Sequence, residues 1–407
     1  MTVNSASSSG AMFLPTRCLH SDSRVRATAD VTVPISVSTT FEYPAGDVHG
    51  SNYPGGQSYH YSRINAPTVA QAEAVLDAIT EGHATLYGSG LTASFAVLAE
   101  YRPRKIALGE CYFGVKNVIE QYKKLVPGVQ VVGIDCAYDG VDLVWLESPL
   151  NPSGEVKDIQ SYALRAHAAG AALVVDATLA PPPLSFPFRQ GADVVVHSAT
   201  KYLGGHSDLL AGVVVSKCPK QTARLHEARS VLGTGTGSLE AWLLLRSLRT
   251  LAVRVRQQSQ TAARLVALLE SHRRSAVATP CHTPSVQQLA LGRSIAVVKH
   301  ASLQQCAAGQ TYIHVQHPEG FGAVFSISFA TAEQAQFVAR HLKLHRFATS
   351  LGGVESLIDW RHGWDATSPP ALLRVSVGLE AFDDLAADWA QALRALDAHL
   401  KASAAKL

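Results

Sequence analysis

Short apolar segments that alternate with helical ones constrain the fold of this 407-residue chain more than any other feature of its sequence. Strands that are apolar throughout are typical of a parallel sheet, because helices cover both of its faces. A helix is expected over residues 159–169, where the apolar positions share one face. The expected strands of the middle region are residues 129–134, 143–146, 172–175, 192–196 and 212–215. The pattern therefore predicts an α/β protein with a mostly parallel sheet covered by helices.

The pattern changes along the chain and predicts three parts. Residues 1–60 are rich in Ser, Thr, Gly and Pro and are expected to form an extended N-terminal arm. Residues 61–255 form the predicted large domain, which begins with helices at 67–79 and 91–100. A long helix is expected to begin at Leu239 and to continue, with breaks, to Leu269, so it crosses from the large domain into a predicted smaller α+β domain of residues 256–407, where a further break follows at Pro280–Pro284. The remaining elements expected there are strands near 311–315, 323–329 and 371–377 and helices at 331–343 and 383–402.

The composition excludes several classes of protein. Lys plus Arg number 35 and Asp plus Glu 32, and the formal net charge of +3 gives no field that attracts nucleic acid. The arginines at 246, 249, 254 and 256 are expected to form a solvated or interface face. No apolar run approaches the roughly 18 residues of a membrane helix, and the first residues lack the features of a secretory signal. The six cysteines are scattered without a CxxC pair, which favours a reduced cytoplasmic protein with no metal site.

Polar clusters follow the expected strands at the end where ligands collect in such sheets. The clusters are residues 147–152, 176–178 and 197–201, together with 88–90 before a helix. They supply one lysine, one aspartate after an apolar strand, several hydroxyls, and free N–H groups at a helix start. Pyridoxal phosphate needs this set: a lysine for its aldehyde, a carboxylate for its pyridine nitrogen, and hydroxyls with N–H groups for its phosphate.

A longer motif connects these clusters to a known family. Residues 195–208 read VVHSATKYLGGHSD, and shorter motifs occur around them in a characteristic order. These motifs are Tyr61-Ser62-Arg63, Ser89-Gly90-Leu91, Glu147-Ser148-Pro149, Asp176-Ala177-Thr178, Ser350-Leu351-Gly352-Gly353 and Arg374-Val375-Ser376-Val377-Gly378. From about Arg17 onward the chain resembles the Cys/Met-metabolism pyridoxal phosphate enzymes, which include cystathionine γ-synthase, the cystathionine lyases and the homoserine sulfhydrylases. The resemblance implies a fold-type I transferase with a sheet of the seven-stranded type and a smaller C-terminal domain.

The resemblance also implies how the site holds its cofactor. Lys201 would bind pyridoxal phosphate covalently and then move protons, Asp176 would pair with the pyridine nitrogen, and Tyr112 would stack on the ring. Further cofactor contacts are expected from Ser89, Gly90, Leu91, Thr178, Ser198 and Thr200, and from Tyr61 and Arg63 of a neighbouring subunit. Each site would then need a homodimer at least, and the family favours a tetramer.

The substrate implied by the resemblance is a small amino acid. Arg374 would hold its α-carboxylate in a bidentate arrangement. Help in holding that carboxylate is expected from Asn151, Ser350 and Leu351.

Some positions depart from the family pattern where cystathionine-handling members bind a distal group. Asn117 stands in place of an arginine that reads a distal acid, and Thr349 in place of a glutamate. Residues 359–364, DWRHGW, replace a Pro-Ala segment, and Arg361 among them is the candidate for binding an acid group on the nucleophile. We therefore expect γ-replacement on an O-acyl-L-homoserine, the O-acetyl ester above all, through a vinylglycine-type quinonoid and with a carbon or amine nucleophile in place of cysteine. Within the family, the sequence looks closest to the branch of γ-substitution enzymes that serve secondary metabolism.

Three alternatives stay open. A thiol nucleophile would make the protein a cystathionine γ-synthase or a homoserine sulfhydrylase. A lyase that cleaves cystathionine or methionine would need no second substrate. A non-catalytic binding protein on the same fold would have no need for both Lys201 and Asp176.

Overall fold

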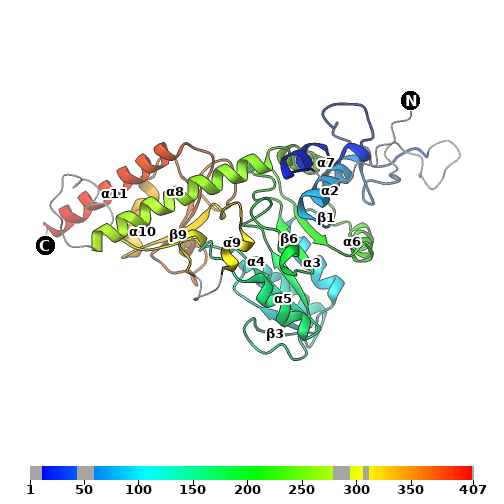
Figure 1. Cartoon of the computed structure of the whole chain (residues 1–407), viewed down its shortest axis with the longest axis horizontal. Helices are drawn as coiled ribbons and strands as arrows, with labels where there is room; N and C mark the ends of the chain where they lie inside the picture. The colour runs from blue at the N-terminus through cyan, green and yellow to red at the C-terminus, as the bar shows by residue number, and fades with distance from the viewer. Residues whose placement is uncertain (1–11, 44–58, 278–293, 306–310, 406–407) are drawn as a thin grey trace.

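A computed structural model describes residues 12–43, 59–277, 294–305 and 311–405, and its centre is a large sheet with helices on both sides (Figure 1). In spatial order its strands are β1 (His83–Tyr87), β7 (Gly212–Ser216), β6 (Val194–Ser198), β5 (Ala172–Asp176), β4 (Leu143–Glu147), β2 (Lys105–Leu108) and β3 (Gln130–Gly133). Strand β7 runs antiparallel to both of its neighbours, and the strands from β6 to β3 are parallel. The predicted α/β fold with a mostly parallel sheet is confirmed.

Alternate side chains of each strand point to opposite faces of this sheet, and each face has its own apolar core. Val144 and Leu146 of β4 face the core that contains α2 (Pro67–Thr80), α5 (Ile159–Ala168) and α7 (Ser238–Leu248). Leu143 and Trp145 face the core that contains α3 (Gly90–Tyr101), α4 (Phe113–Leu125) and α6 (Pro219–Leu232). Burial on both faces explains why these strands are apolar throughout.

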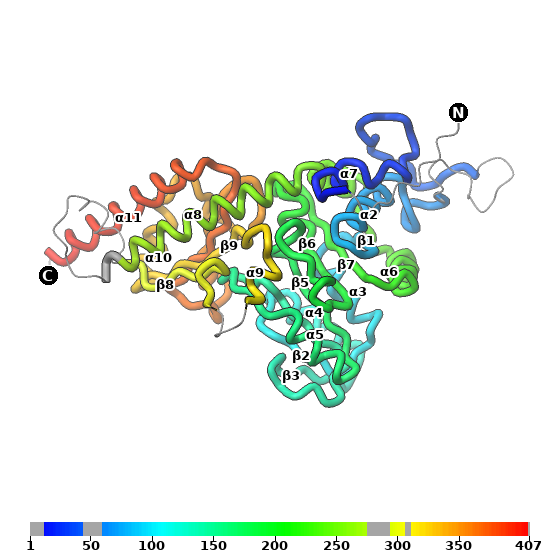
Figure 2. Tube along the Cα trace, in the orientation of Figure 1, coloured from blue at the N-terminus to red at the C-terminus, as the bar shows by residue number. Residues whose placement is uncertain are grey.

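A second sheet of five strands lies with α10 (Ala332–His341) and α11 (Phe382–Ala404) at the left of Figure 1. In spatial order the strands are β10 (Arg346–Phe347), β11 (Leu357–Asp359), β12 (Leu372–Ser376), β9 (Val324–Phe329) and β8 (Ile295–Lys299). The helices are α8 (Leu251–Val277), α10 (Ala332–His341) and α11 (Phe382–Ala404). Figure 2 shows α8 running from the large sheet to the small one, so the predicted domain boundary at residue 255 falls inside this helix. The division of the chain at residues 60 and 255 stays a prediction.

Two expectations about local structure are wrong. The strand expected near 311–315 is a short helix, α9 (Tyr312–Gln316), because its apolar Ile313 is buried against Val156 and Ala301 instead of joining a sheet. The arm is not extended throughout, because α1 (Leu14–His20) buries Cys18 in the main core. Short 3-10 helices complete the described structure: η2 (Ser23–Val25), η4 (Pro187–Gln190), η5 (Ala301–Leu303) and η6 (Arg361–Gly363). The predicted break at Pro280–Pro284 lies outside the described residues.

Among the helices of the described ranges, none combines the length and the apolar character that crossing a membrane requires.

Candidate active site

Three neighbouring strands bring the polar clusters of the sequence to one edge of the large sheet. Glu147 ends β4, Asp176 ends β5 and Ser198 ends β6, and the register pairs Glu147 with Asp176. A pocket of about 430 Å³ opens at this edge. Most of the predicted site residues line it: Ser89, Gly90, Leu91, Tyr112, Asn151, Asp176, Thr178, Ser198, Thr200, Lys201, Ser350, Leu351 and Arg374. Tyr61, Arg63 and Arg361 are not in this lining.

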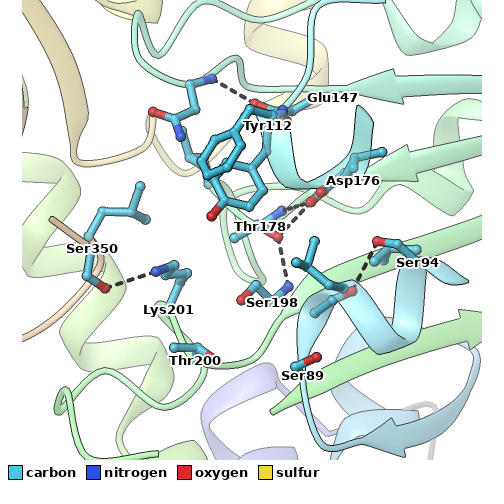
Figure 3. A pocket seen from close by; sticks show the side chains of 18 of the residues that line it. Ser89, Ser94, Tyr112, Glu147, Asp176, Thr178, Ser198, Thr200, Lys201 and Ser350 are labelled. Atoms are coloured by element: carbon cyan, nitrogen blue, oxygen red, sulfur yellow. Dashed lines mark hydrogen bonds between the residues drawn. The ribbon is translucent and has the colours of Figure 1, made fainter. Parts of the chain in front are cut away.

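Lys201 follows β6 and points into the pocket (Figure 3). Its Nζ donates a hydrogen bond of 2.9 Å to Ser350 Oγ, across the two domains. Burial, helped by the positive charge of Arg374, lowers the pKa of Lys201 to about 8. At pH 7 about one such amine in ten is neutral, against fewer than roughly one in a thousand at the ordinary lysine pKa. A neutral amine is the nucleophile that an aldehyde requires.

This pKa predicts how pyridoxal phosphate attaches to the apoprotein. Because only the neutral amine reacts, the attachment rate should rise about tenfold per pH unit below pH 8 and level off above it. Stopped-flow absorbance measures the rate, and Nα-acetyl-lysine serves as the control, since its rate should keep rising to about pH 10. A protein rate that rises in parallel with the control would contradict the lowered pKa.

Asp176 is held by Thr178, which lies two residues farther along the chain. The backbone N–H and the hydroxyl of Thr178 donate to Asp176 Oδ1 at 3.0 and 2.6 Å, and Ser198 N–H donates to the same hydroxyl at 2.8 Å (Figure 3). Within the described residues both hydrogen bonds of this carboxylate end on Oδ1, which leaves Oδ2 for a donor in the pocket. Burial raises the pKa of Asp176, so a cationic partner such as a protonated pyridine nitrogen would stabilise its charged form.

Glu147 is a member of the site to which the sequence assigned no role. Its two carboxylate oxygens accept the backbone N–H groups of Tyr112 and Asn151, at 2.6 and 2.9 Å. Burial and the adjacent Asp176 raise the pKa of Glu147 to about 8. Glu147 therefore positions the start of α4, where Tyr112 and Phe113 lie, from the end of β4.

The start of α3 forms a cradle for an anion. Ser89 caps the helix by accepting the N–H of Thr92 at 3.1 Å, and the N–H groups of Gly90 and Leu91 precede the first intrahelical bonds. Ser198 lies directly opposite, because a Cβ on Gly90 would come within 3.0 Å of Ser198 Cβ. Backbone N–H groups, the positive end of the helix dipole and neighbouring hydroxyls together suit a phosphate group.

Replacing Gly90 with valine is expected to weaken the binding of pyridoxal phosphate by about tenfold or more. The new side chain would enter the cradle against Ser198, and overpacking typically costs about 1–3 kcal/mol. Gly133→Val is the matched control, because a Cβ at that glycine meets nothing within 4 Å. Equilibrium dialysis of the cofactor measures both variants, and equal affinities would argue against a phosphate at this helix.

Arg374 lies in β12, on the opposite wall of the pocket from the large sheet. Its Nη2 donates to the backbone oxygen of Ser350 at 2.8 Å and pairs with Asp359 at 3.0 Å. Its Nε is buried and has no hydrogen-bond partner among the described residues. Burial lowers the pKa of Arg374 to about 10, and the group is still charged at neutral pH.

Arg361 has partners within the protein instead of an open position in the pocket. It is only 4% exposed, donates to Asn151 Oδ1 at 2.9 Å and lies 3.6 Å from Asp365. The ring of Trp364 lies over its guanidinium, at 4.9 Å. This arrangement does not favour the direct contact with an acid group of the nucleophile that the sequence led us to expect.

Tyr61 and Arg63 lie away from the pocket on the same chain. Arg63 donates to the backbone oxygen of Ser230 and lies over the Tyr61 ring at 5.5 Å. Tyr61 is 45% exposed. Neither residue lines the pocket of its own chain, and their cofactor contacts from a neighbouring subunit stay a prediction.

One of the arginines expected on a solvated face is buried, which corrects that expectation. Arg254 of α8 is 4% exposed, and it donates to the backbone oxygens of Tyr202 and Ser247, each at 3.0 Å. It therefore fixes the loop that follows Lys201. Arg254 is buried because α8 packs against this loop, and the backbone carbonyl groups that it meets need a hydrogen-bond donor.

The residues of the pocket fit pyridoxal phosphate. Lys201 supplies an amine with a near-neutral pKa, Asp176 an oxygen free for the ring nitrogen, and the start of α3 a phosphate cradle. The Tyr112 ring faces the same cavity, as Figure 3 shows, and is 36% exposed there.

Comparison with known proteins gives a consistent result. The family described as "Cys/Met metabolism PLP-dependent enzyme" matches residues 15–394. Cystathionine gamma-synthase of Mycobacterium tuberculosis is 32% identical over 401 residues, covering 93% of this chain and 96% of that protein. Cystathionine gamma-lyase of Saccharomyces cerevisiae is 31% identical over 415 residues, covering 93% of this chain and 96% of that protein. The crystal structure of metB from Corynebacterium glutamicum superposes with a TM-score of 0.82 at 29% sequence identity. The match covers 96% of this chain and 100% of that chain. These likenesses confirm the expected fold class and cofactor.

Proposed function

Because the chain belongs to the Cys/Met metabolism family of pyridoxal phosphate-dependent enzymes, we propose that it replaces the γ-acyloxy group of an O-acyl-L-homoserine, O-acetyl-L-homoserine above all, by a nucleophile other than cysteine. One observation carries this proposal. Lys201 and Arg374 are the cations among the described residues that line the pocket, and both lie where the amino-acid end of the substrate would bind. No further cation of that lining is left for the carboxylate of a second amino acid.

The residues of the pocket support the chemistry of γ-replacement. When bound, pyridoxal phosphate supplies a ring that accepts electrons from the substrate carbons. Lys201 Nζ would take the proton from the substrate Cα, hand it on to the bound cofactor, and then take one from Cβ as the acyloxy group leaves as a carboxylate. Its pKa of about 8 suits a base that works near neutral pH. Arg374 binds the α-carboxylate through the donors that its pairs with Asp359 and Ser350 leave open.

A comparison of two incubations tests the proposal. The holoenzyme receives O-acetyl-L-homoserine alone, or together with one member of a panel of thiols, β-keto acids, aldehydes and amines, and mass spectrometry identifies the products. We expect a γ-substituted amino acid only when a carbon or amine nucleophile is present. Release of a 2-oxo acid and ammonia without any nucleophile would make the protein a lyase, and a product formed with thiols alone would make it a cystathionine γ-synthase or a sulfhydrylase.

The proposal includes a second copy of the chain, whose Tyr61 and Arg63 complete the phosphate site. Their position outside the pocket of their own chain supports this arrangement. Arg63→Ala and Lys201→Ala are each expected to be inactive, whereas a coexpressed mixture should recover about a quarter of the activity, because half of random dimers are hybrids with one intact site. A mixture that stays inactive would contradict a shared site.

A further inference from the structure

Two aromatic side chains close the part of the pocket that the amino-acid end of the substrate leaves open. We infer that the substituent carried at the substrate Cγ is uncharged and apolar, with an aromatic group as the best fit, because Phe113 and Trp364 form the wall that it meets. This aromatic wall of Phe113 and Trp364 draws one ring from each domain, since Phe113 begins α4 and Trp364 follows η6. The inference rests on the proposed function and defines the class of its second substrate.

The rings of the aromatic wall form a continuous apolar surface with Tyr112. Tyr112 and Phe113 have centroids 4.6 Å apart with planes inclined by 61°, and Phe113 and Trp364 have centroids 5.4 Å apart at 55°. Despite these contacts Phe113 is 39% exposed and Trp364 is 42% exposed. Aromatic side chains of this size bury much apolar area when a ligand covers them, and a ligand ring could pack against them in the offset-stacked or edge-to-face contacts that aromatic pairs prefer.

The protein satisfies the polar atom of Trp364 internally. The indole Nε1 donates to Asp359 Oδ1 at 3.1 Å, and the backbone N–H of Trp364 donates to the carbonyl oxygen of Arg361, also at 3.1 Å. The Arg361 guanidinium lies under the ring and is fixed by Asn151. A ligand therefore meets the apolar part of the indole, and Arg361 is a positioning residue that acts through Trp364.

Charges in the pocket favour the same class of substituent. The carboxylates Glu147 and Asp176 and the cations Lys201 and Arg374 all lie at the cofactor and amino-acid end. A carboxylate on the distal substituent would lie against the aromatic wall with no cation of the described lining beside it, and an unpaired charge loses its hydration at a large cost. A phenyl or alkyl group loses nothing comparable and gains contact area.

Three amino acids that differ only at Cγ test this inference. L-2-aminobutyrate has no distal group, S-benzyl-L-homocysteine has an aromatic one, and S-carboxymethyl-L-homocysteine has a charged one. Each is mixed with the holoenzyme, and its affinity is read from the visible absorption of the bound cofactor by stopped flow, before any turnover. We expect S-benzyl-L-homocysteine to bind at least about tenfold more tightly than S-carboxymethyl-L-homocysteine.

Variants of the wall sharpen the test. Trp364→Ala should reduce the affinity for the benzyl compound about tenfold and leave that for L-2-aminobutyrate unchanged. Trp360→Phe is the matched control, because this indole donates to the backbone of Pro370 at 2.7 Å and does not line the pocket. Phe113→Arg places a cation in the wall and should reverse the preference in favour of the carboxymethyl compound.

Two results would overturn the inference alone: L-2-aminobutyrate binds but the benzyl compound gains nothing over the carboxymethyl one, or Trp364→Ala weakens all three ligands equally. Failure of all three ligands to bind would instead overturn the proposed function, together with the inference that rests on it.

Discussion

Replacing Lys201 with alanine is expected to lower turnover by about four orders of magnitude while the protein stays folded. Its Nζ is the group placed to move protons at the substrate carbons, and general acid–base catalysis by one side chain contributes about 10²–10⁴-fold. The loss of the covalent attachment of the cofactor adds to this effect. The fold should persist, because burial already disfavours the charged amine and its one described hydrogen bond is to Ser350.

Lys201→Arg is the control for this variant. It keeps a long cationic side chain, but a guanidinium stays protonated at every working pH and cannot serve as the base or the nucleophile. Both variants should therefore be inactive with unchanged circular dichroism. Turnover above about one hundredth of the wild-type rate in Lys201→Arg would assign the proton transfers to another group.

Replacing Arg374 with methionine should raise the substrate KM by roughly a hundredfold or more, since leaving one partner of a buried charge pair unmatched costs about 2–5 kcal/mol. The change also removes the partner of Asp359, which is 4% exposed and lies 3.0 Å away. Breaking a buried ion pair from one side destabilises a protein by about 3–5 kcal/mol. Binding and stability should therefore both decline, and a control has to separate them.

The double variant Arg374→Met with Asp359→Asn makes that separation. It removes the unpaired carboxylate and should recover most of the lost stability in thermal unfolding, because the amide oxygen introduced at position 359 can still accept from the indole of Trp364. The substrate KM should stay high. The pH at which cofactor attachment levels off should also rise, because the charge of Arg374 helps to lower the pKa of Lys201. A double variant with the wild-type KM would exclude Arg374 from carboxylate binding.

Strands β4 to β7 of the central sheet were predictable because they are buried on both faces, and an apolar run bounded by turns then marks each of them. Strand β2 at Lys105–Leu108 was missed, since its lysine and its four-residue length hide the pattern. Helix α4 was missed as well, although its buried Val115, Ile119 and Tyr122 recur at the helical spacing i, i+4, i+7. The segment at 312–316 has the β-branched composition of a strand, but a small local core around Val156 decides its structure.

The polar clusters of the candidate site could be predicted from strand ends, and the resemblance to the family supplied the roles of their individual residues. Three features depend on contacts between distant segments and have no local signal. The role of Glu147 appears only when its carboxylate meets the start of α4. Arg254 becomes buried only when α8 packs beneath the Lys201 loop. The positive charge of Arg361 suits an acid group, but its guanidinium already contacts Asn151 and the ring of Trp364.

Reductive trapping tests most directly whether one amine holds the cofactor. The purified protein is saturated with pyridoxal phosphate, reduced with borohydride, digested and analysed by mass spectrometry, with Lys201→Ala treated in parallel. We expect one modified peptide per chain, with the added mass on Lys201, and no modified peptide from the variant. A wild-type protein that carries no added mass, or carries it on a different lysine, would contradict the assignment of this pocket as a pyridoxal phosphate site.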